Sequence, residues 1–433
     1  MSVELIGVIG IILLFALLCL RMYIGIVMAL IGLLGFGLLA DFETAVSLFG
    51  IVPYSTAHAY TFTVLPLFVL MGQFAYHSGI SADIYKTVHT WFGQLPGGLA
   101  MATIVGCAFF GAICGSSLAT AATMGAVALP EMKKFKYDLG LASGSIAAGG
   151  TLGILIPPSI GFVIYGILIE ESIGRLFMAG ILPGILLTVF YMLTVYISCK
   201  ITPEKGPCAE KSTFKEKILS LKGTWGMLLL FILVMGGIYA GIFTPTEAGG
   251  IGAFGAFLIA IFRRRMSFRI LVLCLRDSIQ TTSMIFLILI GANIFNVFMS
   301  VSQLPMHLAD YIQTLDVNRF IVLSGILILY MILGCIMDGF AMIILTIPIL
   351  FPILISMGFD PIWFGVIMVI VLEMGLITPP VGLNVFILRG VAKDVPMNTI
   401  FKGIWPFLIA SVAAIIVIMI FPQIATYIPY HMK

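Results

Sequence analysis

Charged residues are scarce in this chain. Only 9% of its 433 residues are Asp, Glu, Lys or Arg, while 61% are hydrophobic. An ordinary soluble domain carries about 25% charged residues, so a soluble fold of this size is excluded. Seven long stretches carry no charge at all, namely 44–82, 87–130, 139–169, 176–199, 278–309, 339–359 and 403–432. A bilayer span needs roughly 20 apolar residues, so the composition predicts an all-α membrane protein with several spans.

The sequence also lacks the signatures of soluble enzymes and ATPases. It contains no Walker A loop, no HExxH and no GxSxG, which excludes the chemistries that depend on those motifs. The seven cysteines form no CxxC pair and lie mostly in apolar runs, as expected of small membrane-embedded residues. The net charge of +3 gives no reason to expect a nucleic-acid partner. We predict no catalytic residues, and an energy source that is an ion gradient or a partner protein.

The first apolar segment, residues 5–20, lacks the flanks of a secretory signal. Glu4 precedes it and Arg21 follows it, whereas a signal peptide has a basic start and a small-residue cleavage site. We therefore expect a retained first helix.

Basic and acidic loops alternate along the chain. Short cytoplasmic loops are enriched in Lys and Arg, so we expect Lys133 and Arg264 to be cytoplasmic and Asp316 and Lys433 to be periplasmic. The basic regions are 133–136, 200–222, 263–269 and 389–402, and the acidic or neutral regions are 41–43, 170–171, 244–247, 310–316 and 360.

Two segments do not fit simple alternation. Residues 87–130 have both ends on the expected cytoplasmic side, with Gly115 and Ser116 at the centre, and residues 319–359 have both ends on the other side. A polar backbone turn at that depth cannot face lipid, because unpaired peptide groups there cost several kcal/mol each. We predict two re-entrant helical hairpins with tips buried in protein. Two full crossings in each segment are the alternative.

The chain contains an internal repeat. GILIPP at 153–158 and GLITPP at 375–380 match in form at an offset of 222 residues. PLFVLMG at 66–72 resembles IFLILIG at 285–291. Ser116 and Asp338, in the two hairpin tips, each precede the first proline of their pair by 41 residues. The loop charges place the copies in opposite orientation, which predicts an inverted repeat with two discontinuous helices, since paired prolines interrupt a helix.

Broken helices in a membrane expose carbonyl oxygens that suit alkali cations, and helix N-termini that attract anions. The expected sodium ligands of the first site are Gly111, Cys114, Gly153, Ile156 and Pro158, and those of the second site are Gly334, Gly375, Thr378 and Val381. The expected substrate contacts are Ser116, Ser117, Thr120, Ser159, Asp338 and Asn384. Serine and threonine in membrane helices also bond the carbonyl one turn back, so each hydroxyl has a purely structural alternative.

Two carboxylates lie within the apolar segments. Buried carboxylates are costly and are functional hypotheses by default. Asp338 is expected either to neutralise a cation or to cap the helix that begins at Gly339. Glu373 is interpreted mainly as a structural partner of a neighbouring helix.

These motifs resemble the large membrane subunit of tripartite ATP-independent periplasmic (TRAP) transporters, over nearly the whole chain. The resemblance rests on GSSxAT at 115–120, GILIPPS at 153–159, GLITPPVGLN at 375–384, PLFVLMG at 66–72, and Met337-Asp338 followed by TIP at 346–348. It implies an elevator-type, sodium-coupled carrier in the bacterial inner membrane. It also implies a small membrane (Q) subunit, a periplasmic substrate-binding (P) protein, and small organic acids such as C4-dicarboxylates or sialic acid as substrates. Gly111 and Cys114 stand where serine is common in this family, which leaves their main-chain carbonyls for coordination. The small subunit is expected to be a separate chain.

We expect five regions: scaffold helices in 1–56, a first repeat in 57–175, scaffold helices and a loop in 176–277, a second repeat in 278–395, and a C-terminal helix in 396–433. The main alternative is a stand-alone sodium/dicarboxylate carrier. A channel is disfavoured by the paired hairpins, and an intramembrane enzyme is supported only by Asp338 and Glu373, which lie in unlike contexts.

Overall fold

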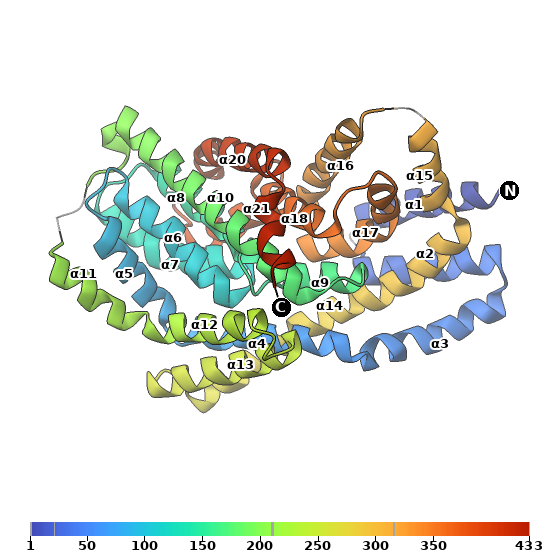
Figure 1. Cartoon of the computed structure of the whole chain (residues 1–433), viewed down its shortest axis with the longest axis horizontal. Coiled ribbons are helices and arrows are strands. Elements are labelled where there is room, and N and C mark those ends of the chain that lie inside the picture. Colours follow the sequence, from blue (N-terminus) through green and yellow to red (C-terminus); the bar gives the residue numbers. More distant parts are fainter. Residues whose placement is uncertain (1, 21, 209–211, 315–316, 433) are drawn as a thin grey trace.

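The computed structural model describes residues 2–20, 22–208, 212–314 and 317–432. Helices make up the fold, and none of the described residues forms a strand (Figure 1). The predicted positions of Asp316 and Lys433 lie outside the described residues. The helices are α1 Val3–Cys19, α2 Ile24–Leu39, α3 Phe42–His58, η1 Tyr60–Thr63, α4 Val64–His77, α5 Ile80–Phe92, α6 Gly98–Cys114, α7 Ser117–Lys134, α8 Leu139–Leu155, α9 Ile160–Leu168, α10 Ile173–Ile201, η2 Pro203–Lys205, α11 Phe214–Ser220, η3 Leu221–Gly223, α12 Trp225–Tyr239, α13 Pro245–Phe262, α14 Phe268–Ser302, α15 Leu304–Thr314, α16 Arg319–Gly334, α17 Gly339–Ser356, α18 Pro361–Ile377, α19 Leu383–Val391, α20 Met397–Ile420 and α21 Gln423–Tyr430.

Several helices are long and apolar enough to cross a membrane. Among the described residues five helices meet this condition singly, and the number rises to eight if each of three bent pairs counts as one span. Since lipid offers no partners for backbone groups, only closed hydrogen-bonding structures such as helices can span it. The chain is therefore a multi-pass membrane protein.

Both double-proline positions interrupt a helix, as predicted. α8 ends at Leu155 and α9 begins at Ile160, with a bend of 42° between them. α18 ends at Ile377 and α19 begins at Leu383. The chain also bends by 54° between α3 and α4. The boundary expected after residue 56 falls just before the end of α3 at His58.

Two helix–turn–helix units occupy the segments in which hairpins were expected. α6 and α7 are joined at Gly115, whose φ of +63° favours glycine, and α7 is capped by the Ser116 side chain. α16 and α17 are joined by residues 335–338. The first unit begins at Gly98 rather than near residue 87, because the end of the amphipathic helix α5 occupies 87–92. The membrane depth of the tips remains a prediction.

The two halves of the chain pack in a crossed arrangement. α2 packs on α14 and α13 packs on α4, while α9 lies against α17 and α19 lies against α7. The α2–α14 crossing is a backbone contact, because a Cβ added to Gly291 would lie 2.0 Å from the carbonyl oxygen of Gly25. Close approach through small residues is typical of membrane helix pairs. Each half therefore completes the packing of the other.

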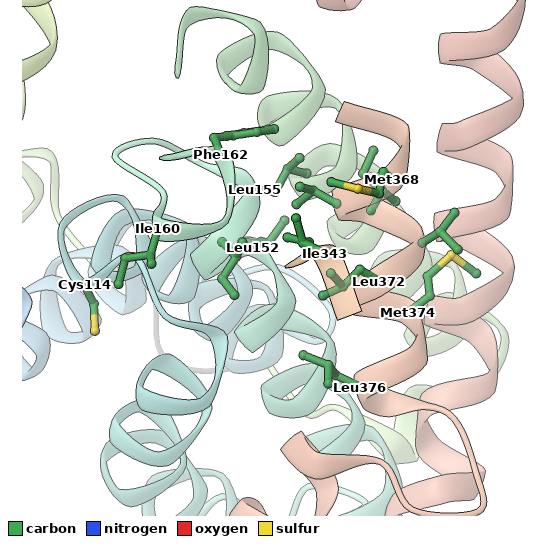
Figure 2. Close-up of a cluster of buried hydrophobic side chains, with 14 of the residues drawn as sticks. Cys114, Leu152, Leu155, Ile160, Phe162, Ile343, Met368, Leu372, Met374 and Leu376 are labelled. Atoms are coloured by element: carbon green, nitrogen blue, oxygen red, sulfur yellow. The ribbon is translucent and has the colours of Figure 1, made fainter. Parts of the chain in front are cut away.

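The core between the two broken helices is apolar. Leu155 of α8, Ile343 of α17 and Leu372 of α18 gather in one buried cluster (Figure 2). Cys114 and Ile160 lie at one side of the same view, beside the first break. This cluster joins the first hairpin and its broken helix to the second pair, so the polar groups of both breaks are set in an apolar surround.

Candidate ion and substrate site

Each Gly-x-x-x-Pro-Pro motif leaves carbonyl groups without their usual donors. In an α-helix the N–H of residue i bonds to the carbonyl of residue i−4, and proline has no N–H. The carbonyl of Gly153 therefore loses the donor that position 157 would supply, and that of Gly375 loses the donor of position 379. The N–H of Thr378 lies 3.1 Å from the Gly375 oxygen, which leaves one lone pair of that oxygen available.

The first hairpin tip lies directly on the first break. A Cβ added to Gly111 would lie 2.5 Å from the Cα of Gly153, and one added to Gly115 would lie 2.9 Å from the carbonyl oxygen of Pro158. A Cβ on Gly153 would lie 2.8 Å from both the Ser116 carbonyl oxygen and the Thr120 hydroxyl. The structure thus brings together three of the ligands expected at the first sodium site and two of the expected substrate contacts: Gly111, Gly153 and Pro158, with Ser116 and Thr120.

The second hairpin repeats this contact. A Cβ added to Gly334 would lie 3.0 Å from the Cα of Gly375, and one added to Gly375 would lie 2.7 Å from the Cα of Gly334. Beyond the break, Gly382 has a φ of +62°, and a Cβ there would lie 3.4 Å from the Thr378 carbonyl oxygen. Gly111–Gly153 and Gly334–Gly375 are therefore equivalent contacts in the two halves.

Three expected cation ligands lie outside these glycine contacts. The carbonyl oxygen of Cys114 faces α4, 2.8 Å from a Cβ added to Gly72. The Ile156 side chain packs on α10, 2.5 Å from a Cβ added to Gly184. Val381 is half-buried and precedes α19. Their role as ligands stays a prediction.

Three of the expected substrate contacts are helix caps. The hydroxyl of Ser116 accepts a hydrogen bond from Ala119 N at 3.3 Å, and that of Ser159 accepts one from Phe162 N at 3.3 Å. The carboxylate of Asp338 accepts one from Phe340 N at 3.1 Å, so the capping alternative is confirmed. These caps leave other lone pairs open, and they mark the N-termini of α7, α9 and α17, which carry partial positive charge.

Two expected site hydroxyls bond the carbonyl one turn back. Thr120 donates to the Ser116 carbonyl at 2.7 Å, and Thr378 donates to the Met374 carbonyl at 2.6 Å. This is the structural alternative for serine and threonine. The bond uses the hydroxyl proton only, so the oxygen of Thr378 can still face a cation.

A buried set of unpartnered polar groups lies between the two halves. Neither carboxyl oxygen of Glu373, nor the Ser117 hydroxyl, nor the Asn384 amide, has a hydrogen-bond partner within the described part of the chain. All three side chains are at most 2% exposed. The side chains of Ser117 and Asp338 lie in the neighbourhood of the Glu373 carboxyl group, which places this carboxyl between the two hairpins. Buried polar groups without partners are costly and mark functional positions.

Asn384 belongs to α19, which packs alongside α7 and so brings this residue toward the set. Leu388 contacts the first hairpin, with its Cδ1 2.8 Å from a Cβ added to Gly125. Lys133 of α7 pairs with Asp394 beyond the end of α19 at 2.5 Å. These two contacts show that α19 and α7 run in the same direction. Asn384 precedes Leu388 by one turn, so it lies one turn closer than Leu388 to the tip of the first hairpin.

Sequence reasoning missed the link between Glu373 and Ser117. It also missed a buried network in which the Tyr191 hydroxyl lies 2.7 Å from that of Ser411 and 3.3 Å from that of Thr151. Neither pairing has a local signal, because the residues are far apart in sequence. No group of three or more His, Cys, Asp or Glu in the described ranges could hold a metal ion.

Comparison with known proteins decides the family. The model of the family described as "Tripartite ATP-independent periplasmic transporter, DctM component" matches residues 11–424. The chain belongs to this family. It is a TRAP large permease, as the sequence motifs indicated.

Curated relatives of this TRAP permease cover most of its length. It is 35% identical to the C4-dicarboxylate TRAP transporter large permease protein DctM of Pseudomonas aeruginosa, over 87% of this chain and 88% of the relative. It is 32% identical to the sialic acid TRAP transporter large permease protein SiaM of Vibrio cholerae, over 86% of each chain. It is also 32% identical to the 2,3-diketo-L-gulonate TRAP transporter large permease protein YiaN of Escherichia coli, over 85% of this chain and 86% of the relative.

Two solved membrane transporters share the fold of this TRAP permease. The Alcanivorax borkumensis YdaH transporter superposes with a TM-score of 0.57 at 16% identity, covering 90% of each chain. Neisseria gonorrhoeae MtrF superposes with a TM-score of 0.58 at 15% identity, covering 87% of this chain and 84% of the other. At these identities the likeness concerns the fold alone.

Proposed function

We propose that this permease is the carrier subunit of a sodium-driven importer of a small organic acid in the bacterial inner membrane. The observation that carries the proposal is the pair of equivalent contacts, Gly111–Gly153 and Gly334–Gly375, each beside a helix broken by two prolines. Oxygen atoms are the ligands that hard cations prefer. Two such breaks supply two sets of carbonyl oxygens.

An anionic substrate fits between the tips only when cations are also bound. The N-termini of α7, α9 and α17 favour an anion, but the Asp338 carboxylate repels it. Two like charges 4 Å apart at an effective dielectric constant of 20 repel by about 4 kcal/mol. Bound sodium ions would offset this repulsion, so anion binding would depend on sodium.

The substrate class follows from the relatives. C4-dicarboxylate, sialic acid and 2,3-diketo-L-gulonate appear in their names, and all three are small organic acids. The buried hydroxyl of Ser117 and amide of Asn384, both unpartnered, are suitable donors for a carboxylate or a hydroxyl group.

Alternating access is proposed to occur by an elevator movement within an inverted repeat. The crossed packing of α2 on α14 and of α13 on α4 supports a scaffold formed by both halves. The two hairpins and broken helices form the unit that moves, with the apolar cluster of Figure 2 holding it together. A small membrane subunit and a periplasmic binding protein complete the proposed transporter.

Reconstituted vesicles test this function. The permease is co-reconstituted with the small subunit and supplied with the binding protein, and uptake of radiolabelled succinate, sialic acid and 2,3-diketo-L-gulonate is measured. We expect uptake of one acid, driven by an inward sodium gradient and absent with potassium. Equal uptake in potassium would refute sodium coupling. Saturable uptake by this chain alone would favour the stand-alone carrier.

A further inference from the structure

The segment α11–η3 leaves the axis of the apolar helix α12 at a sharp angle. Residues 214–223 and α12 are together long and apolar enough to cross a membrane, yet they are bent by 60° at their junction. α11 lies beside α5 at one end of the molecule (Figure 1). A short helix that turns away from a membrane span is placed to lie along the membrane surface.

One face of this segment is fixed by hydrogen bonds from other helices. Thr87 Oγ1 of α5 donates to the Ser220 carbonyl at 2.8 Å, and Trp91 Nε1 of α5 donates to the Lys217 carbonyl at 3.2 Å. The guanidinium of Arg263, after α13, donates to the Gly223 carbonyl at 2.6 Å. These bonds hold the backbone against α5 and α13, so the direction of the opposite face is also set.

The opposite face is apolar and exposed. Phe214, Ile218 and Leu221 are spaced by 4 and 3 positions, which places them on one side of the segment, and they are 74%, 52% and 41% exposed. Trp225, at the start of α12, is 58% exposed. Tryptophan at the end of a membrane span is typical of the lipid–water interface. An exposed apolar stripe of this kind is stabilised when lipid or another apolar surface removes it from water.

Basic side chains accompany this stripe. Lys215, Lys217 and Lys222 lie in or next to α11, and none of them forms an ion pair with a described residue. The carboxylate of Glu216 is engaged in a capping box, accepting a hydrogen bond from Thr213 N at 2.8 Å. That bond keeps the pKa of Glu216 below its usual value. The local excess of charge is therefore positive.

We propose that the α11 surface, formed by Phe214, Ile218, Leu221, Trp225 and the three lysines, binds anionic phospholipids of the leaflet around the α11 end of α12. The apolar side chains enter the region between headgroups and acyl chains, and the lysines contact the phosphates. Since α5 connects α4 to the first hairpin, bound lipids would fix the start of that hairpin at the membrane surface.

Spin labelling tests the position of this surface. In a background with Cys19→Ser and Cys208→Ser, Ile218→Cys is labelled with a nitroxide in vesicles of phosphatidylglycerol and phosphatidylcholine, with Lys402→Cys as the exposed control. We expect the label at position 218 to be more accessible to oxygen than to a water-soluble nickel complex, with the reverse at position 402. Strong access of nickel at position 218, or shielding from both reagents by a protein partner, would overturn the proposal.

Lipid selectivity tests the role of the lysines. Binding of dioleoyl phosphatidylglycerol and phosphatidylcholine to the full chain in neutral detergent is compared by native mass spectrometry. We expect a preference for phosphatidylglycerol that falls about tenfold or more in the variant K215Q/K217Q/K222Q and also falls in high salt. The matched variant K200Q/K393Q/K402Q removes the same charge elsewhere and should keep the preference. Equal binding of both lipids by the unmodified protein, or equal losses in both variants, would contradict the proposal.

Discussion

At the scale of single residues, the site depends on glycines that allow backbones to touch. Gly153 is one such position, because its missing side chain leaves room for the Ser116 carbonyl and the Thr120 hydroxyl. Gly375 has the same role against Gly334. A methyl group at either position must displace backbone atoms, and those atoms carry the oxygens proposed to bind sodium.

Gly153→Ala is expected to weaken sodium activation of uptake by about tenfold or more, because overpacking shifts the backbone. Gly325→Ala is the control, since a Cβ there would meet nothing within 4 Å. The measurement is the sodium concentration for half-maximal uptake in vesicles. The same sodium dependence in both variants would show that the Gly111–Gly153 contact is not part of an ion site.

Thr378→Ala is expected to raise the half-maximal sodium concentration about tenfold, equivalent to roughly 1.4 kcal/mol. The hydroxyl donates its proton to Met374 and leaves its oxygen for a cation. Thr378→Ser keeps this oxygen and should behave like the unmodified protein. An alanine variant with normal sodium activation would leave the hydroxyl with its structural role alone.

The site could be only partly predicted from sequence at this scale. The prolines and their glycines are local signals with a direct physical meaning, so the sequence predicts the breaks and the pairing of each hairpin tip with a broken helix. The approach of Glu373 to Ser117 depends on how α18 packs against α8 of the first repeat, and no short-range pattern encodes it. For the same reason the sequence favours a structural role for Glu373, although both of its oxygens lack partners among the described residues.

At the scale of helices, α8 and α20 make a very close crossing. A Cβ added to Gly403 would lie 1.9 Å from the carbonyl oxygen of Gly140, and one added to Gly144 would lie 2.3 Å from that of Gly403. Gly140 and Gly144 are separated by one turn, a spacing typical of membrane helix contacts. This crossing attaches the first broken helix to α20.

Gly403→Ala is expected to destabilise the protein by about 1–3 kcal/mol, because the added methyl group would push the two helices apart. Thermal unfolding in detergent measures the effect. Gly390→Ala serves as the control, since that position is open and alanine is the better helix former. Equal unfolding temperatures for the two variants would contradict a rigid contact between α8 and α20.

Helix ends were predicted less well than helix breaks. The first hairpin was expected over 87–130, a range defined by the absence of charge, but its helices run from Gly98 to Lys134. Gly97, with a φ of +71°, separates the hairpin from α5. Charge marks where a chain leaves the membrane, whereas turns depend on backbone conformation, and the two need not coincide.

At the scale of the whole molecule, two ion pairs involve residues of the predicted basic loops. Lys133 pairs with Asp394, and Arg263 pairs with Asp83. Lys133 hydrogen-bonds the Asp394 carboxylate and thereby lowers its pKa. This exposed pair joins the end of the first hairpin to the loop after α19, on the side where the basic loops gather.

Side-specific labelling tests the orientation. Arg264→Cys is expected to react with an impermeant thiol reagent only after the membrane is opened, and Asp310→Cys is expected to react in intact cells. The reason is the enrichment of Lys and Arg in cytoplasmic loops. Both variants are made in the background lacking Cys19 and Cys208. Reversed labelling would invert the topology and, with it, the direction assigned to transport.

The crossed packing of the two halves has a consequence for biosynthesis. α2 packs on α14, and α4 packs on α13. In both pairs the ribosome makes the first helix well before the helix on which it packs. Until then, the glycine-lined side of α2 is covered only by lipid or by the insertion machinery. Assembly of this protein is therefore completed after translation has passed its midpoint, and a chain truncated there is left without the surfaces against which it folds.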